Sequence, residues 1–214
     1  MAGVRLGLLG PANGDVGAFA RAAAFLLNDA KVGRAIYLGA DDALDEAVAL
    51  WAESLVGPEA SDAGLWDRAF APAEDGTPAQ IDAFLRGERA RLRLKCLEAL
   101  APPGLRSVEM VGDRLALVVH DTACLDEDDI FSAALVLYGK SDSPVVRRIG
   151  PRWFLAPGPV GCAGGGACIL DDSSETVVLR FYDLDGHETR AEELEAHRAG
   201  VFTVQAAASP GRAK

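Results

Sequence analysis

Apolar runs and amphipathic stretches alternate along the first part of the chain. Residues 4–9 and 34–39 are short apolar runs bounded by turn residues, a pattern typical of buried strands. Residues 15–30 and 42–55 follow these runs with apolar side chains at helical spacing, so each predicts a helix. A strand–helix–strand–helix order favours parallel strand pairing and therefore an α/β architecture.

The pattern changes after the second helix. Residues 57–77 are rich in Pro, Gly, Asp and Ala and predict a loop, which carries the large side chains of Leu65, Trp66 and Phe70. Residues 78–100 predict one long helix, opened by a proline and closed by a Pro-Pro-Gly sequence. The chain beyond consists of short β-rich runs separated by turns, which predict a series of strands.

Composition and charge narrow the classes of partner. The chain has 214 residues, half of them hydrophobic, which is enough for one sizeable core. We expect one domain over residues 1–190, followed by a partly disordered C-terminal helix or tail over residues 191–214. The formal net charge of -11 argues against binding to nucleic acid or to an anionic membrane, because both need a basic surface.

The N-terminal apolar run is interrupted by Pro11, which makes it too short for a signal peptide or a membrane span. We therefore expect a cytoplasmic protein. Its cysteines show no C-x-x-C spacing and are expected to stay reduced; they are Cys96, Cys124, Cys162 and Cys168.

Two architectures fit this order of elements. A doubly wound Rossmann-like sheet would need a phosphate-binding fingerprint at its first strand-to-helix turn. Residues 10–17 read GPANGDVG, which supplies glycines but neither G-x-G-x-x-G nor G-x-x-x-x-G-K-[ST]. The other architecture is a sandwich of two sheets, with helices covering the outer face of each sheet.

The sandwich agrees with a known family. Small calcineurin-like metallophosphoesterases of the bacterial and archaeal phosphodiesterase type carry S-D-x-H-G, L-G-D, G-N-H-D/E, His-Gly, G-H-T-H and N-P-G-S turns at successive strand ends. This chain resembles them in order, spacing and strand context from about residue 4 to about residue 186. Its corresponding segments are GPANG (10–14), LGA (38–40), VGPE (56–59), VVHD (118–121), YGKSD (138–142) and APGP (156–159). The resemblance implies a four-layer αββα sandwich with two mixed sheets flanked by helices.

The resemblance also implies a two-metal centre that hydrolyses phosphate esters, but most of its ligands are replaced. The family's cleft positions are occupied here by Pro11, Asn13, Ala40, Pro58, Glu59, His120, Lys140 and Asp142. Pro11 and Ala40 replace carboxylates and cannot bind a metal, and only His120 keeps the residue type of its position. A site without both carboxylates and with an added lysine would leave two divalent cations unneutralised. We therefore predict no metal cofactor and no catalytic residues.

The resulting hypothesis is a catalytically inactive relative that acts as a regulatory or scaffolding binding module. Its partner would be a protein, a second copy of the chain or an anionic ligand held by the cleft residues Asn13, His120, Lys140 and Asp142. Lys140 has a simpler alternative role, which is to pair with Asp121 or Asp142 at a loop tip.

The alternative function is a phosphoesterase that hydrolyses phosphate mono- or diesters with a rebuilt single-metal site. One divalent metal such as manganese or zinc would then be held by side chains from the set Asn13, Asp15, Asp41, His120 and Asp142.

Two further expectations concern the rim of the cleft. Gly10, Gly14, Gly39, Gly139 and Gly158 stand where the family's turns need positive φ or close backbone approach. The apolar side chains of the 57–77 loop are costly to leave in water, so we expect this loop to fold back over the vacant cleft. The alternative is that they form a docking site for a partner.

Overall fold

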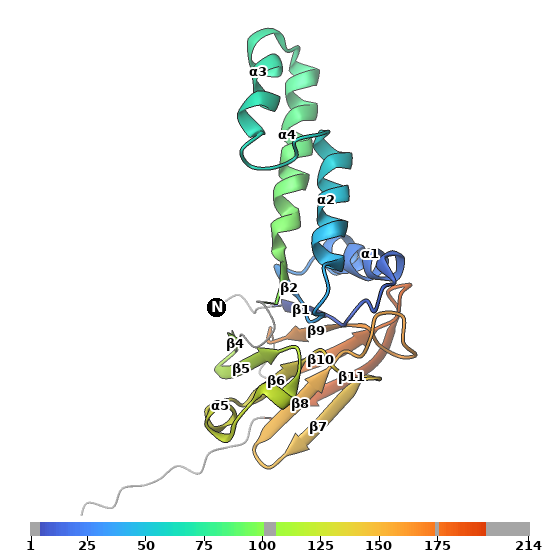
Figure 1. Cartoon of the computed structure of the whole chain (residues 1–214), viewed down its shortest axis with the longest axis vertical. Helices are drawn as coiled ribbons and strands as arrows, with labels where there is room; N and C mark the ends of the chain where they lie inside the picture. Colours follow the sequence, from blue (N-terminus) through green and yellow to red (C-terminus); the bar gives the residue numbers. More distant parts are fainter. Residues whose placement is uncertain (1–4, 101–105, 174–175, 196–214) are drawn as a thin grey trace, which may run out of the picture.

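Two sheets face each other in the computed structural model, which describes residues 5–100, 106–173 and 176–195 (Figure 1). One sheet has six strands in the order β11-β10-β9-β1-β2-β3, and the other has five in the order β4-β5-β6-β8-β7. Each sheet mixes parallel and antiparallel pairs. A doubly wound sheet with an antiparallel extension would be one continuous sheet, so the division of the strands between two separate sheets confirms the predicted sandwich.

The six-stranded sheet is built around β1, which pairs in parallel with β2 and antiparallel with β9. Leu8 of β1 lies opposite Ile36 on one side and Cys168 on the other. The strands of this sheet are β1 (Arg5–Leu9), β2 (Arg34–Tyr37), β3 (Leu97–Ala99), β9 (Ala167–Asp171), β10 (Val177–Tyr182) and β11 (Glu188–Leu194).

The five-stranded sheet has three neighbouring parallel strands, β5, β6 and β8, with an antiparallel strand at each edge. Its strands are β4 (Ser107–Val111), β5 (Arg114–Val119), β6 (Leu135–Tyr138), β7 (Val145–Ile149) and β8 (Arg152–Ala156). The β-rich runs predicted in this half of the chain are thus confirmed as strands.

Successive side chains of a strand point to opposite faces of the sheet. The apolar side chains of the six-stranded sheet therefore form two core layers, one between the two sheets and one between the six-stranded sheet and its helices. In β1, Leu6 and Leu8 face the second sheet, whereas Leu9 faces the helices. In β2, Ile36 faces the second sheet and Tyr37 the helices. Because successive strand side chains point to opposite faces, a strand that is buried on both faces is apolar throughout. This explains why β1 and β2 appear as unbroken apolar runs.

Helices cover both outer faces. Helix α1 (Val16–Ala24), which continues as a π-helical turn (Phe25–Asp29), and α2 (Ala43–Val56) lie over the six-stranded sheet. The short helix α5 (Glu127–Phe131) lies over the other sheet, where Ile130 packs against the cluster of Leu117 and Val136. The result is the expected four-layer αββα order. No helix in the described part of the chain is long and apolar enough to cross a bilayer.

An arm of three helices extends from the sandwich (Figure 1). Helix α2 packs along α4 (Pro78–Arg93), and α3 (Leu65–Asp75) packs against α4 at its far end. Helix α4 begins with a capping box between Thr77 and Gln80 and ends in a short 3₁₀ turn (Leu94–Cys96) that leads directly into β3. We call α3, α4 and the adjoining part of α2 the helical arm.

The arm corrects two predictions. Residues 57–77 do not form a loop, because Leu65–Asp75 is a helix; Pro72 inside it obscured the pattern. They also do not fold back over the cleft. Trp66 and Phe70 lie on the arm, with 80% and 66% of their surfaces exposed.

Two more boundaries differ from prediction. The helix expected up to residue 100 ends at Arg93, and Leu97–Ala99 is an edge strand. At the other end of the chain, β11 crosses the expected domain boundary at residue 190 and runs to Leu194, so residues 191–194 are strand and not helix. The rest of the predicted tail, residues 196–214, lies outside the described residues.

Candidate functional site

The ends of strands from both sheets meet at one edge of the sandwich. Nδ1 of His120, which follows β5, lies 2.7 Å from the backbone oxygen of Leu38, which follows β2. Gly139, which follows β6, approaches the same Leu38 carbonyl so closely that a side chain would collide with it. Three of the motif-like turns are therefore brought together across the two sheets, as the sequence predicted.

A fourth turn closes over the end of β1. The backbone N–H of Gly10 donates to the oxygen of Gly166 at 2.9 Å, and that of Val160 donates to the oxygen of Pro11 at 2.9 Å. A side chain on Gly10 would meet the carbonyl of Gly158, which itself has a φ of 75°. These contacts leave little room above Pro11 and confirm the roles predicted for these two glycines.

Tyr37 ties the loop after β1 to the loop after β2. Its hydroxyl accepts a hydrogen bond from the backbone N–H of Ala12 at 2.9 Å and donates one to the Asp41 carboxylate. The residue is only 1% exposed, and its ring packs edge-on against Phe19 with centroids 4.8 Å apart. Burial raises the pKa of the Tyr37 hydroxyl, and the bond to Asp41 raises it further, so the group stays neutral.

Two acidic residues of the predicted single-metal set have structural partners. Asp15 accepts a hydrogen bond from the Ala18 N–H at 2.8 Å and thereby caps α1. Asp41 accepts from Tyr37 and, at 3.3 Å, from the N–H of Ala43. A metal at either carboxylate would have to compete with these bonds.

His120 is oriented by its contact with Leu38. A carbonyl oxygen only accepts hydrogen bonds, so Nδ1 of His120 must carry the proton. In the neutral imidazole, Nε2 is then left with a free lone pair. The same arrangement, a ring N–H held by a backbone carbonyl, orients many metal-binding histidines. The contact therefore fixes the ring of His120 through Nδ1 and leaves Nε2 as the nitrogen with a free lone pair.

Lys140 is engaged in an ion pair. Its Nζ lies 2.5 Å from a carboxylate oxygen of Asp121. This bond lowers the pKa of Asp121 and raises that of Lys140. Of the two pairings that the sequence suggested for Lys140, the structure shows the one with Asp121. An anion in the cleft would have to displace this carboxylate.

Pro58 and Glu59 are not at the cleft, which corrects their assignment to the third motif. They follow the C-terminal end of α2, a helix of 14 residues that begins near Ala40. At ~1.5 Å per residue, the helix carries them about 20 Å away. The backbone oxygen of Glu59 instead accepts a bond from Arg68 of the helical arm. The strand that does return to this edge is β3, and it leads into residues 101–105, which lie outside the described residues.

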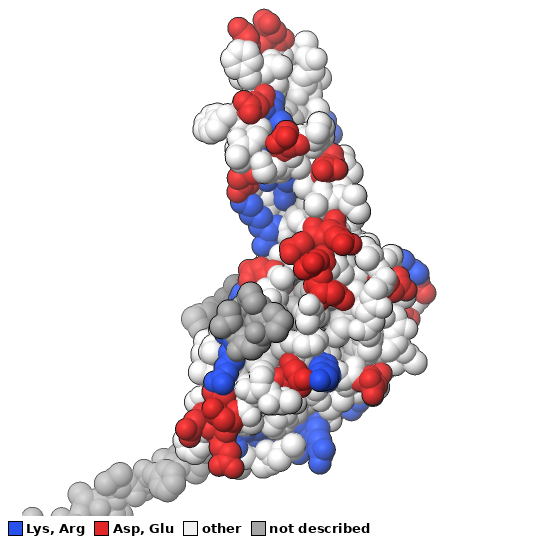
Figure 2. All heavy atoms as spheres, in the orientation of Figure 1, with Lys and Arg blue, Asp and Glu red and all other residues white. Residues whose placement is uncertain are grey.

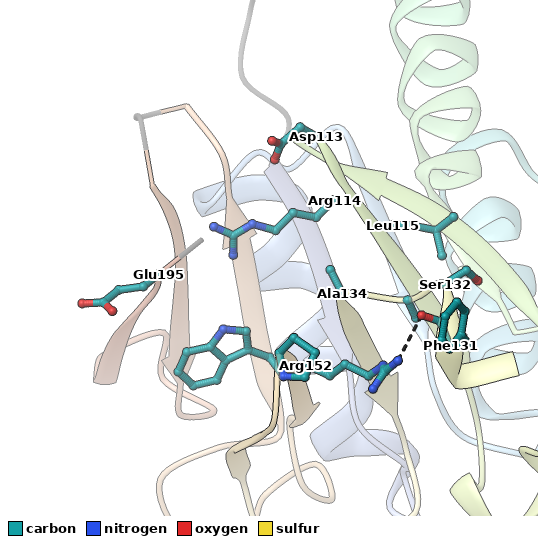
Figure 3. A pocket seen from close by; sticks show the side chains of 11 residues that line it. Asp113, Arg114, Leu115, Phe131, Ser132, Ala134, Arg152 and Glu195 are labelled. Carbon is teal, nitrogen blue, oxygen red and sulfur yellow. Dashed lines mark hydrogen bonds between the residues drawn. The ribbon is translucent and has the colours of Figure 1, made fainter. Parts of the chain in front are cut away.

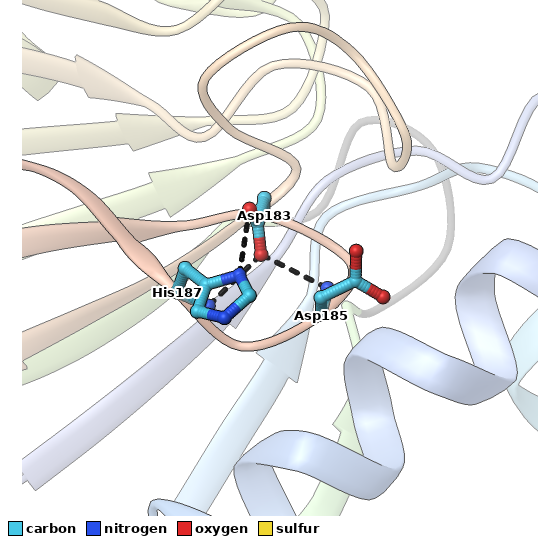
Figure 4. Close-up of side chains that lie close together, drawn as sticks. All are labelled: Asp183, Asp185 and His187. Carbon is cyan, nitrogen blue, oxygen red and sulfur yellow. Dashed lines mark hydrogen bonds and ion pairs between the residues drawn. The ribbon is translucent and has the colours of Figure 1, made fainter.

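Within the described ranges, the one group of three carboxylate, imidazole or thiol ligands with atoms within 4.8 Å of one another includes none of the predicted cleft residues. It consists of Asp183, Asp185 and His187 in the turn between β10 and β11 (Figure 4). Asp183 accepts bonds from the backbone N–H groups of Asp185 and His187, each at 2.9 Å, and Asp185 pairs with Arg21 at 2.5 Å. These bonds stabilise the turn, so the three side chains lie close together without a metal being needed to explain it.

The sequence matches no protein-family model and no curated protein. Solved structures match in fold. The structure of Vacuolar Protein Sorting 29 from Cryptosporidium parvum is 16% identical, covers 91% of this chain and 99% of its own, and gives a TM-score of 0.51. A predicted phosphoesterase from Streptococcus pneumoniae is 16% identical over 91% of this chain and 98% of its own, with a TM-score of 0.47. A novel archaeal phosphodiesterase is 14% identical over 89% of this chain and 100% of its own, with a TM-score of 0.44.

The similarity to the Vacuolar Protein Sorting 29 structure agrees with the two facing sheets and with the turns at the ends of their strands. The chain has the metallophosphoesterase fold. At this level of identity the likeness extends to the fold alone.

The two-metal centre of metallophosphoesterases does not fit the residues at this edge. Pro11 and Ala40 offer no side-chain ligand at the ends of β1 and β2. No three of the candidates Asp15, Asp41, His120 and Asp142 bring ligand atoms within 4.8 Å of one another. Asn13, with a φ of 50°, is exposed. The scaffold of the metallophosphoesterase site is present, whereas its donor set is not.

Sequence reasoning missed Tyr37 altogether. A tyrosine near the end of an apolar strand reads as core, and nothing in its position shows that the hydroxyl will meet Asp41 and the Ala12 N–H. The sequence offers one signal for this bond, which is that Tyr37 and Asp41 are four residues apart. That spacing brings the two side chains together only because the chain turns at Gly39.

Proposed function

We propose that this chain is a catalytically inactive protein with the metallophosphoesterase fold, and that it binds a partner protein through its helical arm. The observation that carries the proposal is the exposure of Trp66 and Phe70 on that arm, 80% and 66% respectively. Large apolar side chains gathered on an exposed surface are typical of interaction sites.

The inactivity rests on residue chemistry at the cleft. Metal-assisted hydrolysis needs carboxylate ligands that neutralise the cations and a bound water that becomes the nucleophile. Pro11 and Ala40 supply no ligand, and Lys140 brings a positive charge whose counter-ion is Asp121. The loops themselves are held by bonds that need no metal, such as those of Tyr37 and Gly10.

The arm is an ordered element. Glu88 of α4, 5% exposed, lies between two arginines, with Arg68 of α3 at 2.8 Å and Arg91 of α4 at 2.7 Å. Arg91 also pairs with Asp62 at 2.8 Å. These pairs fix α3 on α4, so Trp66 and Phe70 are presented at defined positions. Little conformational freedom would be lost when they are covered.

The surface of the arm favours a partner with basic groups around an apolar centre. Figure 2 shows acidic side chains at the tip of the arm, along its side and where it joins the sandwich, with Lys and Arg side chains between them lower on the arm. Further large apolar side chains of the arm helices are exposed; they are Leu50, Leu55, Ile81, Leu85 and Leu92. An apolar surface edged by acidic groups complements a partner of opposite charge at its rim.

The experiment compares purification of the tagged wild type with that of a Trp66→Ala/Phe70→Ala variant from the native cell. We expect a stoichiometric protein to accompany the wild type and to be lost from the variant, whose melting temperature stays unchanged. The control is Phe131→Ala, because Phe131 is equally exposed, at 80%, but lies on α5. If wild type and variant retain the same proteins, or if neither retains any, the arm is not a docking site.

A second function is favoured by one observation, the free Nε2 that the geometry of His120 implies. It is hydrolysis of phosphate mono- or diesters by a single divalent metal such as manganese or zinc, held by His120 with other side chains of the set Asn13, Asp15, Asp41 and Asp142. If Asp41 were a ligand, its carboxylate would have to exchange the Tyr37 hydroxyl for the metal. Metal analysis and turnover assays separate the two functions, as detailed in the Discussion.

A further inference from the structure

A pocket of ≈ 390 Å³ opens at the edge of the sandwich opposite to the cleft (Figure 3). Strands β5 and β8 run in the same direction through the five-stranded sheet, and their carboxyl ends lead to the cleft. The pocket is lined by residues of their amino ends, Arg114 and Arg152–Trp153, together with Phe131, Pro151 and Glu195. It is therefore distinct from the cleft and independent of the proposed function.

The register of the strands places Arg114 and Trp153 on the same face. Trp153 of β8 lies beside Leu135 of β6, which lies beside Ala116 of β5. Arg114 precedes Ala116 by two residues, so its side chain leaves the sheet on the same side. That side is the inner face, because Ala116, Leu135 and Trp153 all belong to the core between the sheets. Both side chains thus border the space between the two sheets.

Two side chains that line this pocket carry hydrogen-bond donors without an acceptor among the described residues, and only the Arg114 guanidinium extends into the pocket. The indole Nε1 of Trp153 is buried and makes no hydrogen bond with any described residue. The guanidinium of Arg114 is half-buried and has neither a hydrogen bond nor an ion pair among residues 5–100, 106–173 and 176–195. Figure 3 shows the Arg114 side chain extending into the pocket, while the carboxylate of Glu195 points away from it. Buried donors without a partner are uncommon in folded proteins and mark a place for a missing acceptor.

The other arginine of the pocket has its partners. Nε of Arg152 donates to the oxygen of Ile130 at 2.8 Å, and Nη2 donates to that of Phe131 at 3.0 Å. Elsewhere in the fold, half-buried Arg34 and Arg180 lie in ion pairs with glutamate or aspartate. Arg114 thus differs from these arginines, because neither of the carboxylates that line the pocket, those of Asp113 and Glu195, pairs with it.

The geometry points to a binding site for a small organic monocarboxylate. The carboxylate would accept hydrogen bonds from the Arg114 guanidinium, and the apolar body would lie against Pro151, the ring of Trp153 and the exposed ring of Phe131. A single negative charge is favoured over two. Arg114 and Arg152 are balanced by Asp113 and Glu195 at the rim, and these two carboxylates would repel a dianion such as phosphate.

The test titrates the full-length, ¹⁵N-labelled protein with benzoate and follows the indole N–H signals. The Trp153 signal is identified by its loss in Trp153→Phe. We expect it to shift saturably with benzoate but not with benzyl alcohol or inorganic phosphate, while the signals of Trp51 and Trp66 stay in place. In Arg114→Gln the affinity should fall by about tenfold or more, because a charge-assisted bond is lost.

Two controls keep this test decisive. Arg86→Gln removes an exposed arginine of the helical arm and should leave the titration unchanged. Arg114→Lys keeps the charge without the planar fork and should retain weaker binding. The site is excluded if benzoate causes no saturable shift of the Trp153 signal. It is also excluded if Arg114→Gln, with a folded spectrum, binds benzoate as tightly as the wild type does.

Discussion

His120 donates its Nδ1 proton to the carbonyl oxygen of Leu38, 2.7 Å away, and so joins the end of β5 in one sheet to the end of β2 in the other. In a metal site this bond would orient the imidazole as a ligand. Here the bond holds the two sheets together at the edge of the sandwich where Pro11 and Ala40 stand in place of the family's metal-binding carboxylates. His120 is the residue on which the two candidate functions differ.

Metal content distinguishes the inactive binding protein from the single-metal phosphoesterase. We expect protein purified without chelator to hold substoichiometric manganese, iron, zinc and nickel, because the carboxylates that would neutralise a cation are missing. Elemental analysis measures this directly. A full equivalent of metal in the wild type that disappears in His120→Ala would establish a rebuilt single-metal site and overturn the inactive assignment.

Hydrolysis of phosphate esters is the second measurement that distinguishes the two candidate functions. We expect no hydrolysis of aryl phosphate mono- or diesters above that of His120→Ala, with or without added manganese or zinc, because Pro11 and Ala40 replace the carboxylates that would hold a metal to activate water. Equal residual rates in both proteins would indicate a contaminating hydrolase. A rate that rises with added metal and requires His120 would support the phosphoesterase alternative.

Tyr37→Phe tests the bond that ties the two loops after β1 and β2. The substitution leaves the Ala12 N–H and an Asp41 oxygen without their partner, so we expect the free energy of unfolding to fall by about 1–3 kcal/mol. Chemical denaturation measures the change. Tyr138→Phe is the matched control, because the Tyr138 hydroxyl makes no hydrogen bond within the described part of the chain and its loss should cost below ~0.5 kcal/mol. Equal effects of the two substitutions would show that the Tyr37 bonds contribute nothing to stability.

Glu88→Ala tests the ion pairs that hold the helical arm. It leaves the buried guanidiniums of Arg68 and Arg91 without their shared carboxylate, which should destabilise the arm by roughly 3–5 kcal/mol. Exposed Glu53 of α2 provides the control, since Glu53→Ala should change stability by no more than ~0.5 kcal/mol. Hydrogen exchange of α3 and α4 localises the effect, and unchanged exchange in Glu88→Ala would contradict it.

The same carboxylate should make the arm sensitive to acid. Burial would raise the pKa of Glu88, but its bonds to Arg68 and Arg91 outweigh burial and lower it. A carboxyl group with a depressed pKa stabilises the folded state above its unfolded pKa of about 4.3 and loses this contribution as the pH falls further. The protection factors of the α3 amides, measured from pH 7 to pH 3, should therefore fall below about pH 4.3 in the wild type. In Glu88→Gln this acid-dependent step should be absent.

Trp66→Ala and Phe19→Ala should differ sharply in stability. Phe19 is fully buried beneath Tyr37, and its truncation should cost about 3–5 kcal/mol. Trp66 is exposed, so its truncation should change the free energy of unfolding by no more than ~0.5 kcal/mol. Denaturation of the two variants under the same conditions measures both values. A large loss in Trp66→Ala would mean that the ring is covered in solution.

The sandwich could be predicted from the sequence because its strands are short apolar runs that end in glycine turns. Gly10, Gly139 and Gly158 mark close contacts with neighbouring backbone, so their turns can be recognised in the sequence although the ligand positions beside them carry other residues. The arm could not be predicted in this way. Pro72 and the flanking glycines of α3 read as loop, and β3 is too short to interrupt the amphipathic pattern of α4.

The misplacement of Glu59 follows from the same cause. The family pattern assumes that the chain returns to the sheet soon after α2, whereas here it first builds the arm and returns only at Leu97. Other features depend on tertiary contacts that no local pattern encodes. The Tyr37 hydroxyl and the unpaired donors of Arg114 and Trp153 could be identified only when the strands had been placed side by side.

Helix α4 has a mechanical consequence, because no flexible linker separates it from the sheet. It passes through a single 3₁₀ turn into β3, the edge strand beside β2, and β2 leads to Leu38 and its bond with His120. A rigid helix of 16 residues is a lever of about 24 Å, so a load at its tip is applied as torque at the edge of the six-stranded sheet. Engagement of Trp66 would thus be transmitted to the β2–β3 ladder, where the Leu100 N–H bonds the Tyr37 oxygen at 3.1 Å.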